Sequence, residues 1–348
     1  MKRILIVSYN GCGNEGGVER VVSQQYGCLT KLGYDVIVID KKKINIVKKI
    51  KNNALSIILF SIFSSCYLWS QKIRHGNTLF VISHGFSAPL FISNLLISHG
   101  CMAQYIKSTQ SNKKIISSGR VLSLFEKISG KLAKKIWAVS DRVKMEWSNN
   151  YNINRDKISV VNNYIDTYNF TNYKLTGLVP TILFAGRLEA GKGTNHLLTL
   201  ANKFPEIKFL FVSNIKPNID LSSFKNITVH IQVPNNEMPK IYNSATCTIL
   251  PSKYEGFELV TIESLSCGTP IIGYDVGAIH ELSEKKSPGV FQVNDIYELE
   301  LKISELIEQY NDPDYAISNR QSLCDFYKNI LSEKTYFSKL KKEISHDA

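Results

Sequence analysis

The chain has 348 residues, of which 44% are hydrophobic and 10% aromatic, and its 42 Lys and Arg outnumber 30 Asp and Glu. This composition excludes wholesale disorder, and the length exceeds what one hydrophobic core usually supports, so two domains are expected. The formal net charge of +12 favours anionic partners such as phosphorylated ligands or an acidic membrane surface. Without zinc-knuckle spacing or an RNP-type aromatic run, nucleic acid is not an expected partner. The seven cysteines are scattered and never spaced as CxxC, which argues against a disulfide framework and a metal site.

The N-terminus runs from Lys2 and Arg3 directly into the apolar residues 4–7, without the pattern of a cleaved signal peptide. The longest uncharged apolar stretch, residues 54–70, has 17 residues and is shorter than the ~20 of a membrane span. We therefore expect a cytoplasmic protein, either soluble or peripheral on the inner face of the membrane.

Strand and helix patterns alternate along the first half. Residues 4–8 predict a strand, 18–32 a helix and 34–40 a second strand, which together form a βαβ unit with glycines at its first turn. Further strands are predicted at residues 78–83, 95–98, 135–139 and 158–161, and helices at 47–73, 120–133 and 141–150.

A second alternating cycle begins near residue 180. Strands are predicted at residues 181–185, 208–212, 228–232, 247–250 and 270–274, and helices at 195–204, 239–243, 258–267 and throughout the tail from 295. The polar stretch 167–179 predicts a linker. The expected fold class is α/β, with two Rossmann-like parallel-sheet domains facing across a cleft, residues 1–168 and 175–330, and a C-terminal helix in 331–348 that packs back on the first domain.

The glycine-rich turn Gly11–Gly16 spells GxGxxG between a strand and a helix. Asp40 closes the second strand, where a ribose-binding acid lies in dinucleotide-binding folds. The turn is longer than a tight dinucleotide turn, because Ser8, Tyr9 and Asn10 precede the first glycine. A loop for phosphate or acceptor is favoured, and NAD(P) or FAD binding and a purely structural loop are the alternatives.

The segment from Leu250 to Pro270 carries the most informative pattern. A strand leads into a polar turn, and a helix starts near Glu258 and ends at Gly268. The backbone N–H groups of the turn therefore lie at the carboxyl edge of a parallel sheet, where ligands bind. Glu255 in the turn and Glu263 in the helix are two carboxylates suited to the vicinal hydroxyls of a sugar and a ribose. The alternative for Glu263 is an ordinary solvated helix position.

This segment resembles the E-x7-E signature of the retaining glycosyltransferases of family 4, which have the two-domain GT-B fold. Four more segments resemble that family in the same order: residues 16–19 (GGVE), 97–100 (ISHG), 185–193 (AGRL followed by KG) and 276–281 (VGAIHE). The resemblance covers about residues 4–285.

The resemblance implies a role for each matching residue. Arg187 and Lys192 would bind the donor diphosphate, and Glu263 the ribose hydroxyls. Glu255 would hold the transferred sugar and, with His99, form the catalytic pair. The remaining donor-binding positions are glycines of the first loop and backbone amides of the turn: Gly16, Gly17, Gly256, Phe257 and Leu259. His84 ends the preceding strand and is a second histidine of the same kind.

Two positions depart from the family. Glu258 stands where Gly, Ser or Pro is frequent, and an additional carboxylate there would bear on donor choice. Residues 162–166 (NNYID) replace the usual PNGVD.

The resemblance implies transfer of a hexose or N-acetylhexosamine with retention, from a nucleotide sugar (UDP-sugars favoured) to a hydroxyl of a glycan or lipid-linked acceptor. It implies no metal cofactor, and the pathway would be lipopolysaccharide, O-antigen or capsule biosynthesis in a bacterium. Residues 41–75 contain lysine runs before an apolar, then aromatic stretch, which suits a helix lying on an anionic membrane surface. A buried helix with a basic end is the alternative there.

Three other functions fit parts of the pattern. A sugar-nucleotide epimerase shares the architecture, although it leaves the match after Glu255 unexplained. A non-catalytic module that binds a sugar nucleotide or a membrane is a second, and a dehydrogenase using the glycine-rich turn is a third.

Overall fold

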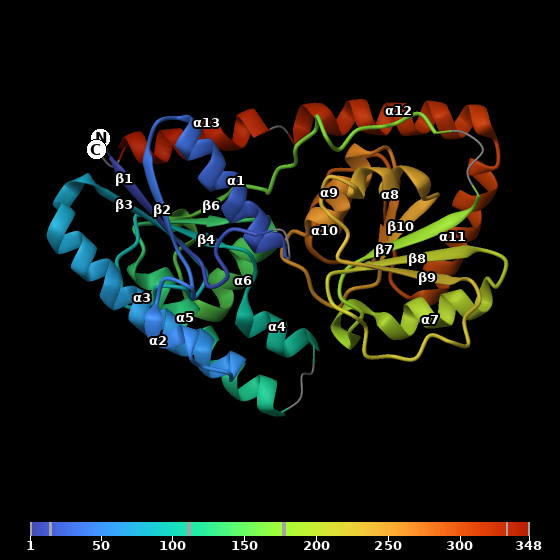
Figure 1. The fold of residues 1–348 in the computed structure, drawn as a ribbon. Coiled ribbons are helices and arrows are strands. Elements are labelled where there is room, and N and C mark those ends of the chain that lie inside the picture. The colour runs from blue at the N-terminus through green and yellow to red at the C-terminus, as the bar shows by residue number, and fades with distance from the viewer. Residues whose placement is uncertain (1, 14–15, 110–112, 176–178, 332, 347–348) are drawn as a thin grey trace. The chain divides into compact units, whose positions relative to one another are not determined.

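The computed structural model divides the chain into two compact units. The first contains Met1–Asn163 and Lys334–Ala348, and the second contains Tyr164–Glu333. The structure describes residues 2–13, 16–109, 113–175, 179–331 and 333–346. The chain enters the second unit just before the polar stretch 167–179, and its last helix belongs to the first unit (Figure 1).

The first unit is built on a six-stranded parallel sheet with the strand order β2-β1-β3-β4-β5-β6. Its strands are β1 (Arg3–Val7), β2 (Asp35–Ile39), β3 (Leu79–His84), β4 (Leu95–Ser98), β5 (Lys135–Ala138) and β6 (Ile158–Val160). Its helices are α1 (Gly17–Lys31), α2 (Asn45–Lys48), α3 (Asn53–His75), α4 (Met102–Thr109), α5 (Lys113–Leu132), α6 (Asp141–Tyr151) and α13 (Glu333–His346), with short 3-10 turns at Gly76–Thr78 and Arg155–Lys157.

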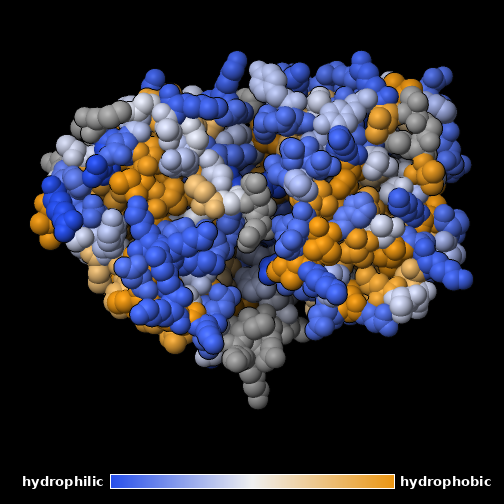
Figure 2. Space-filling model, in the orientation of Figure 1, coloured by the Kyte–Doolittle hydropathy of each residue, from blue (hydrophilic) through white to orange (hydrophobic). Residues whose placement is uncertain are grey.

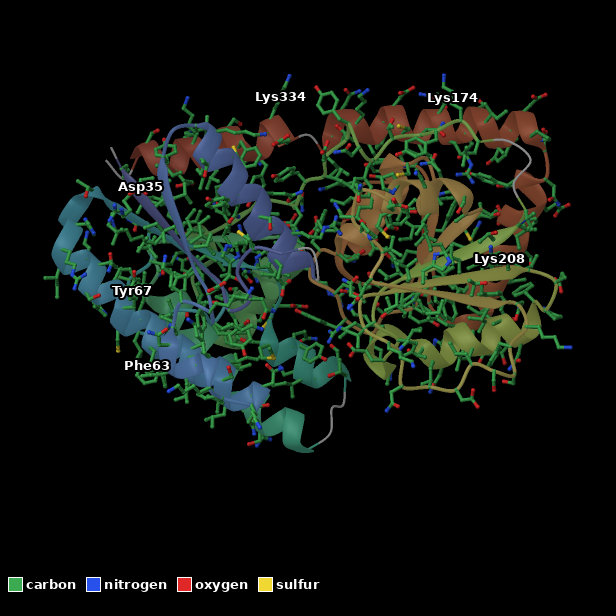
Figure 3. The ribbon with its side chains drawn as sticks, viewed as in Figure 1. Asp35, Phe63, Tyr67, Lys174, Lys208 and Lys334 are labelled. Carbon is green, nitrogen blue, oxygen red and sulfur yellow. The ribbon has the colours of Figure 1, made fainter. Side chains whose placement is uncertain are left out.

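Helix α3 covers one face of this sheet. Its Phe60 and Leu68 are fully buried in a core cluster with Leu5 and Val7 of β1, and Phe63 and Tyr67 pack against the edge of that cluster (Figure 3). By length and composition alone, α3 is also long and apolar enough to cross a membrane. Because one stripe of the helix forms part of the core, we interpret α3 as a covering helix of this unit.

The C-terminal helix α13 is anchored to the same unit. Lys2 donates from Nζ to the carbonyl of Ile344 at 2.6 Å, and Lys135 on β5 pairs with Glu343 at 2.5 Å.

The second unit repeats the plan with a six-stranded parallel sheet of order β12-β11-β10-β7-β8-β9. Its strands are β7 (Thr181–Ala185), β8 (Lys208–Ser213), β9 (Ile227–Ile231), β10 (Cys247–Leu250), β11 (Ile271–Gly273) and β12 (Val290–Gln292). Its helices are α7 (Thr194–Lys203), α8 (Met238–Ser244), α9 (Leu259–Ser266), α10 (Gly277–Glu284), α11 (Ile296–Tyr310) and α12 (Pro313–Ile330), with a 3-10 turn at Ala190–Lys192. Phe184, Phe209 and Phe211 of the central strands pack with α7 and α11 in its core.

Both sheets have a point where the strand order reverses. In the first unit β1 lies between β2 and β3, and in the second β7 lies between β8 and β10. The loops after β1 and β3, and those after β7 and β10, therefore leave neighbouring strands in opposite directions, which is where ligands bind in such folds.

The predicted α/β fold with two parallel sheets is confirmed, and strands 95–98, 181–185 and 247–250 lie at the predicted residues. The helix predicted around residues 47–73 is confirmed as α3 over most of its length, but it begins later, because Asn52 caps α3 by accepting a hydrogen bond from the Leu55 amide at 3.2 Å. Three elements were not predicted from the sequence: α4, α10 and β12.

Candidate functional site

Two loops of the second unit meet at the carboxyl edge of its sheet. One follows β7 and holds Arg187 and Lys192, and the other follows β10 and holds Glu255. β7 and β10 are hydrogen-bonded neighbours, and the amide of Lys253 donates to the carbonyl of Gly191 at 3.0 Å. The two loops therefore form one surface at the point where the strand order reverses.

Gly193 allows this close approach. Its φ is +76°, and a Cβ atom at this position would lie 2.1 Å from the carbonyl oxygen of Pro251. Only glycine adopts this conformation without strain and leaves room for the second loop.

Lys192 and Glu255 form an ion pair across the two loops. Nζ of Lys192 lies 2.5 Å from Oε1 of Glu255, and the side chains are 23% and 11% exposed. The structure thus joins a cation predicted to bind phosphate and a carboxylate predicted to hold a sugar.

Arg187 lies on the same loop, but its guanidinium pairs with Glu189 at 3.1 Å and its side chain is 56% exposed. It therefore supplies positive charge at the same edge while keeping the rotameric freedom of an exposed side chain.

A short turn joins Glu255 to helix α9. Gly256, Phe257 and Leu259 are all buried, and α9 begins at Leu259. The first turn of any helix has amides without partners inside the helix, and its dipole favours an anion.

Glu263 is not a solvated helix residue. Only 1% of its surface is exposed, and its Oε2 accepts a hydrogen bond from the Tyr242 hydroxyl at 2.8 Å. Tyr242 comes from the preceding helix α8 and fixes the carboxylate inside the unit.

Glu258, the departure from the family pattern, connects three parts of this region. Its carboxylate accepts the amide of Ala278 at 3.0 Å and the hydroxyl of Thr261. A Cβ atom at Gly277 would lie 2.0 Å from its Oε2, so the glycine makes room for this carboxylate at the start of α10. Burial, together with the neighbouring charge of Glu255, raises the pKa of Glu258 to about 7.

The glycine-rich loop of the first unit leads into α1. Gly16 is the N-cap of this helix with extended backbone, and a Cβ atom at exposed Gly17 would meet nothing within 4 Å. Gly13 is tied to the helix by a 2.9 Å hydrogen bond from its amide to Ser23. Residues 14–15, in the middle of the predicted motif, lie outside the described residues. Asp40 accepts the amides of Lys42 and Lys43 at 3.0 Å and so closes a local turn.

His99 follows β4 and lies beside His84, the last residue of β3. Nδ1 of His84 is 2.7 Å from Nε2 of His99, and the two rings are nearly parallel, with an interplanar angle of 7° and centroids 5.0 Å apart. Burial lowers the pKa of His99 to about 4 and that of His84 well below its ordinary value. Both imidazoles are therefore neutral at pH 7.

Residues 173–322 match the family model described as glycosyl transferases group 1. This match lies within the second unit, which is thereby similar to the group 1 glycosyltransferases. The whole chain is similar to a glycosyltransferase of unknown specificity from Haemophilus influenzae, with 28% identity over 95% of this chain and 100% of that protein. It is also similar to the O-antigen chain mannosyltransferase RfbU of Salmonella typhimurium, with 24% identity over 72% of this chain and 71% of that protein.

Solved structures of low sequence identity show that the chain has the GT-B fold. Sucrose-phosphate synthase from Thermosynechococcus elongatus superimposes with a TM-score of 0.78 at 16% identity, covering 100% of both chains. WaaG, a glycosyltransferase involved in lipopolysaccharide biosynthesis, superimposes with a TM-score of 0.73 at 14% identity, covering 96% of this chain and 98% of WaaG.

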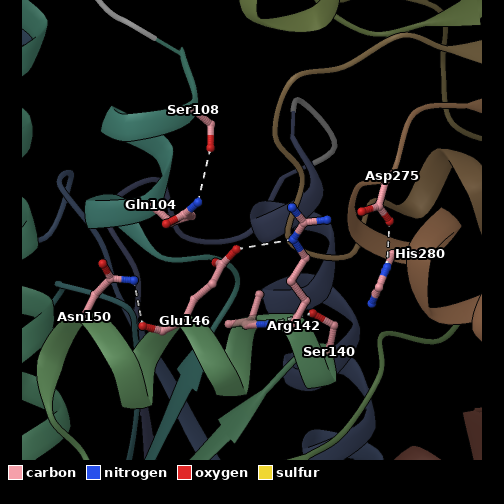
Figure 4. A network of polar contacts seen from close by, with 9 residues as sticks. Gln104, Ser108, Ser140, Arg142, Glu146, Asn150, Asp275 and His280 are labelled. Carbon is pink, nitrogen blue, oxygen red and sulfur yellow. Dashed lines mark hydrogen bonds and ion pairs between the residues drawn. The ribbon is translucent and has the colours of Figure 1, made fainter. Parts of the chain in front are cut away.

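Several polar contacts of the two units were not predicted from the sequence. His280 on α10 pairs through Nδ1 with Asp275 at 2.6 Å, and on α6 of the first unit Arg142 lies 3.5 Å from Glu146 (Figure 4). The resemblance of residues 276–281 pointed to the first of these regions. Tyr242, which holds Glu263, carried no signal, because its contact depends on how α8 and α9 pack.

The raised pKa of Glu258 makes the stability of the second unit depend on pH. A carboxyl group whose pKa is raised on folding favours folding below its ordinary pKa of 4.5, and this contribution is lost as the pH rises through about 7. The unfolding free energy of the wild type should fall between pH 5 and pH 8 because Glu258 ionises. In Glu258→Gln we expect this fall to be smaller by about 1–3 kcal/mol. Urea denaturation followed by circular dichroism at both pH values measures it.

The matched control is Glu206→Gln, which removes the same charge from an exposed turn. This control should keep the wild-type pH dependence. An unchanged pH dependence in Glu258→Gln would contradict the assignment.

Proposed function

We propose that the protein is a retaining glycosyltransferase of the family 4 type, with a nucleotide sugar as donor and a hydroxyl group as acceptor. The observation that carries this proposal is the ion pair between Lys192 and Glu255 on two joined loops at the reversal of strand order. A phosphate-binding cation and a sugar-binding carboxylate are required at adjacent positions by a donor whose sugar is bonded to a diphosphate.

The proposed roles of the donor residues follow from their chemistry. Lys192 and Arg187, with the amides at the start of α9, stabilise the negative charge that develops on the departing diphosphate. Glu255 turns to the hydroxyls of the transferred sugar once Lys192 is engaged by phosphate, and Glu263, held by Tyr242, faces the ribose. We propose that these groups suffice without a metal ion.

In the reaction the bond between the anomeric carbon and the diphosphate oxygen breaks, and the acceptor oxygen bonds to that carbon on the same face. The acceptor proton passes to a leaving phosphate oxygen, and His99 accepts a hydrogen bond from the sugar. Gly16 and Gly17 let the backbone at the start of α1 approach the donor phosphates or the acceptor.

The donor is proposed to be a UDP-hexose or UDP-N-acetylhexosamine. One solved neighbour, HepE from Anabaena, was determined with UDP-glucose, and another, starch synthase IV from Arabidopsis thaliana, with ADP. RfbU and WaaG are described as acting in O-antigen and lipopolysaccharide biosynthesis. We accordingly propose a glycan or lipid-linked acceptor of a bacterial surface polysaccharide, and a cytoplasmic location.

A panel of UDP-, ADP-, GDP- and dTDP-sugars, scored for release of nucleoside diphosphate with and without membrane extract, tests this function. We expect one donor class to be turned over faster with extract, in the presence or absence of EDTA. A donor converted to another sugar nucleotide without release would favour the epimerase, and binding without turnover would favour a non-catalytic module. No turnover and no binding of any sugar nucleotide would overturn the proposal.

We also propose that the first unit lies on an anionic membrane surface through residues 41–75. Leu55, Trp69 and Ile73 are 47%, 43% and 84% exposed, and at 3.6 residues per turn they share the side of α3 opposite buried Phe60 and Leu68. Exposed lysines precede this helix at positions 48, 49 and 51. Exposed apolar side chains can insert at the boundary of the acyl chains, while nearby lysines bind the anionic headgroups. Figure 2 shows hydrophobic residues interspersed with hydrophilic ones on the visible face of the protein.

Sedimentation with vesicles tests this surface. The double variant Leu55→Ser/Ile73→Ser should bind anionic vesicles about tenfold more weakly than wild type. The two partly exposed side chains together offer the membrane about as much apolar area as one fully buried aliphatic side chain, and this area is lost. The control Tyr297→Ser/Leu301→Ser removes two similarly exposed side chains from α11, 70% and 71% exposed, and should bind like wild type. Equal binding of anionic vesicles by the two variants would reject a membrane role for α3. Wild-type binding to neutral vesicles as strong as to anionic vesicles would reject the proposed anionic surface.

A further inference from the structure

Four side chains of the first unit form a chain of hydrogen bonds that ends at His99. Gln25 on α1 donates from Nε2 to the hydroxyl of Tyr336 on α13 at 2.6 Å. Its Oε1 lies 3.2 Å from Nε2 of His84, and Nδ1 of His84 lies 2.7 Å from Nε2 of His99. The C-terminal helix is thereby linked to a residue at the end of a central strand.

Three of these four side chains are buried. Gln25, His84 and Tyr336 are 0%, 3% and 5% exposed. Gln25 lies on the buried stripe of α1 between Val21, Val22 and Leu29, where a polar side chain is unfavourable unless its hydrogen bonds are made. An apolar side chain would pack more favourably at this position. The presence of Gln25 is therefore explained by its hydrogen-bond partners, Tyr336 and His84.

The direction of each hydrogen bond follows from the chemistry of the groups. The carboxamide oxygen of Gln25 can only accept, so Nε2 of His84 carries a hydrogen. A neutral imidazole protonated at Nε2 accepts at Nδ1, so His99 must donate from its own Nε2. Nδ1 of His99 is then a hydrogen-bond acceptor, and no hydrogen bond to this atom is made by the part of the chain that the structure describes.

We propose that Tyr336, Gln25 and His84 are positioning residues that hold His99 in its Nε2–H tautomer, so that Nδ1 accepts a hydrogen bond from a hydroxyl of the transferred sugar. This inference rests on the proposed function for its ligand, while the tautomer itself does not. Burial keeps both imidazoles neutral, because it lowers the pKa of His99 to about 4 and that of His84 as well. The Tyr336 hydroxyl accepts from Nε2 of Gln25, which leaves Oε1 to face His84, and this amide orientation sets the tautomer of both histidines.

Long-range 1H–15N correlation spectra of the full chain labelled with 15N-histidine report the tautomer without any substrate. His99 is assigned by the loss of its signals in His99→Gln. We expect the Nε2–H pattern for His99 in the wild type at pH 7.5. In Gln25→Leu and Tyr336→Phe the second tautomer should become populated, because the amide acceptor is removed or free to reorient.

The matched control is Tyr327→Phe. Tyr327 is also buried, and its hydroxyl also takes part in hydrogen bonding, donating to the carbonyl of Pro288 at 2.7 Å in the second unit. This variant should leave the His99 tautomer unchanged. An Nδ1–H or doubly protonated His99 in the wild type, or an unchanged tautomer in Gln25→Leu and Tyr336→Phe, would overturn the assignment.

Binding measurements separate the ligand from the tautomer. Tyr336→Phe should weaken binding of the donor sugar nucleotide about tenfold, the equivalent of about 1.4 kcal/mol, and binding of its nucleoside diphosphate less than twofold. Equal weakening of both ligands would overturn the sugar contact. If the donor panel finds no sugar nucleotide, the proposed function fails while the spectra still decide whether the relay sets the tautomer.

Discussion

Replacing Lys192 by alanine should lower kcat/KM for the nucleotide-sugar donor about 100- to 1,000-fold while the chain stays folded. The ammonium group of Lys192 bridges the loops after β7 and β10, and the side chain is 23% exposed, so it can turn from Glu255 to a bound phosphate. In the role proposed for Lys192, its removal takes away a cation that stabilises the leaving diphosphate, and this stabilisation is larger in the transition state than in the bound donor.

The loss of activity must be separated from the effect of an unpaired carboxylate. Lys192→Ala leaves Glu255 without its partner at 11% exposure, which lowers stability by itself. Lys203→Ala is a close control, because it leaves Glu300 unpaired, also at 11% exposure, between α7 and α11. Steady-state kinetics should show the large loss only in Lys192→Ala. Near-normal turnover in this variant would remove Lys192 from the donor site.

The sequence predicted the order of elements because each strand is a short apolar run and each strand–helix junction has glycine or polar residues. It also predicted which residues follow the strands, so Lys192 and Glu255 could be assigned to the same sheet edge. The contact between their side chains could not be predicted, because it depends on the close approach of the two loops at Gly193 and Pro251.

The contacts of Glu258, Glu263 and His99 could not be predicted for a related reason. Each has partners that come from a different element: Ala278 at the start of α10, Tyr242 on α8, and His84 at the end of β3. Local periodicity carries no information on which side chains of distant elements face each other. The sequence therefore identified Glu258 as atypical but suggested a role in donor choice, whereas in the structure its carboxylate accepts the amide at the start of α10.

Gly193→Ala should lower the unfolding free energy of the second unit by about 2–4 kcal/mol and kcat/KM at least tenfold. Two costs add at this position: the left-handed backbone with φ of +76°, and the 2.1 Å approach of a Cβ atom to the carbonyl of Pro251. The loops can relieve the clash only by moving apart, which separates Lys192 from Glu255.

Gly33→Ala measures the first cost alone, because Gly33 has φ of +84° and a Cβ atom there would meet nothing within 4 Å. It should lose only about 1–2 kcal/mol and keep its activity. All three tryptophans, Trp69, Trp137 and Trp147, lie in the first unit, so their fluorescence reports Gly33→Ala, while circular dichroism reports both variants. If the two substitutions cost the same and neither reduces turnover, the junction of the loops at Gly193 does not hold Lys192 in place. A larger cost at Gly193, together with lost activity, would tie the fold of this junction to the chemistry of the site.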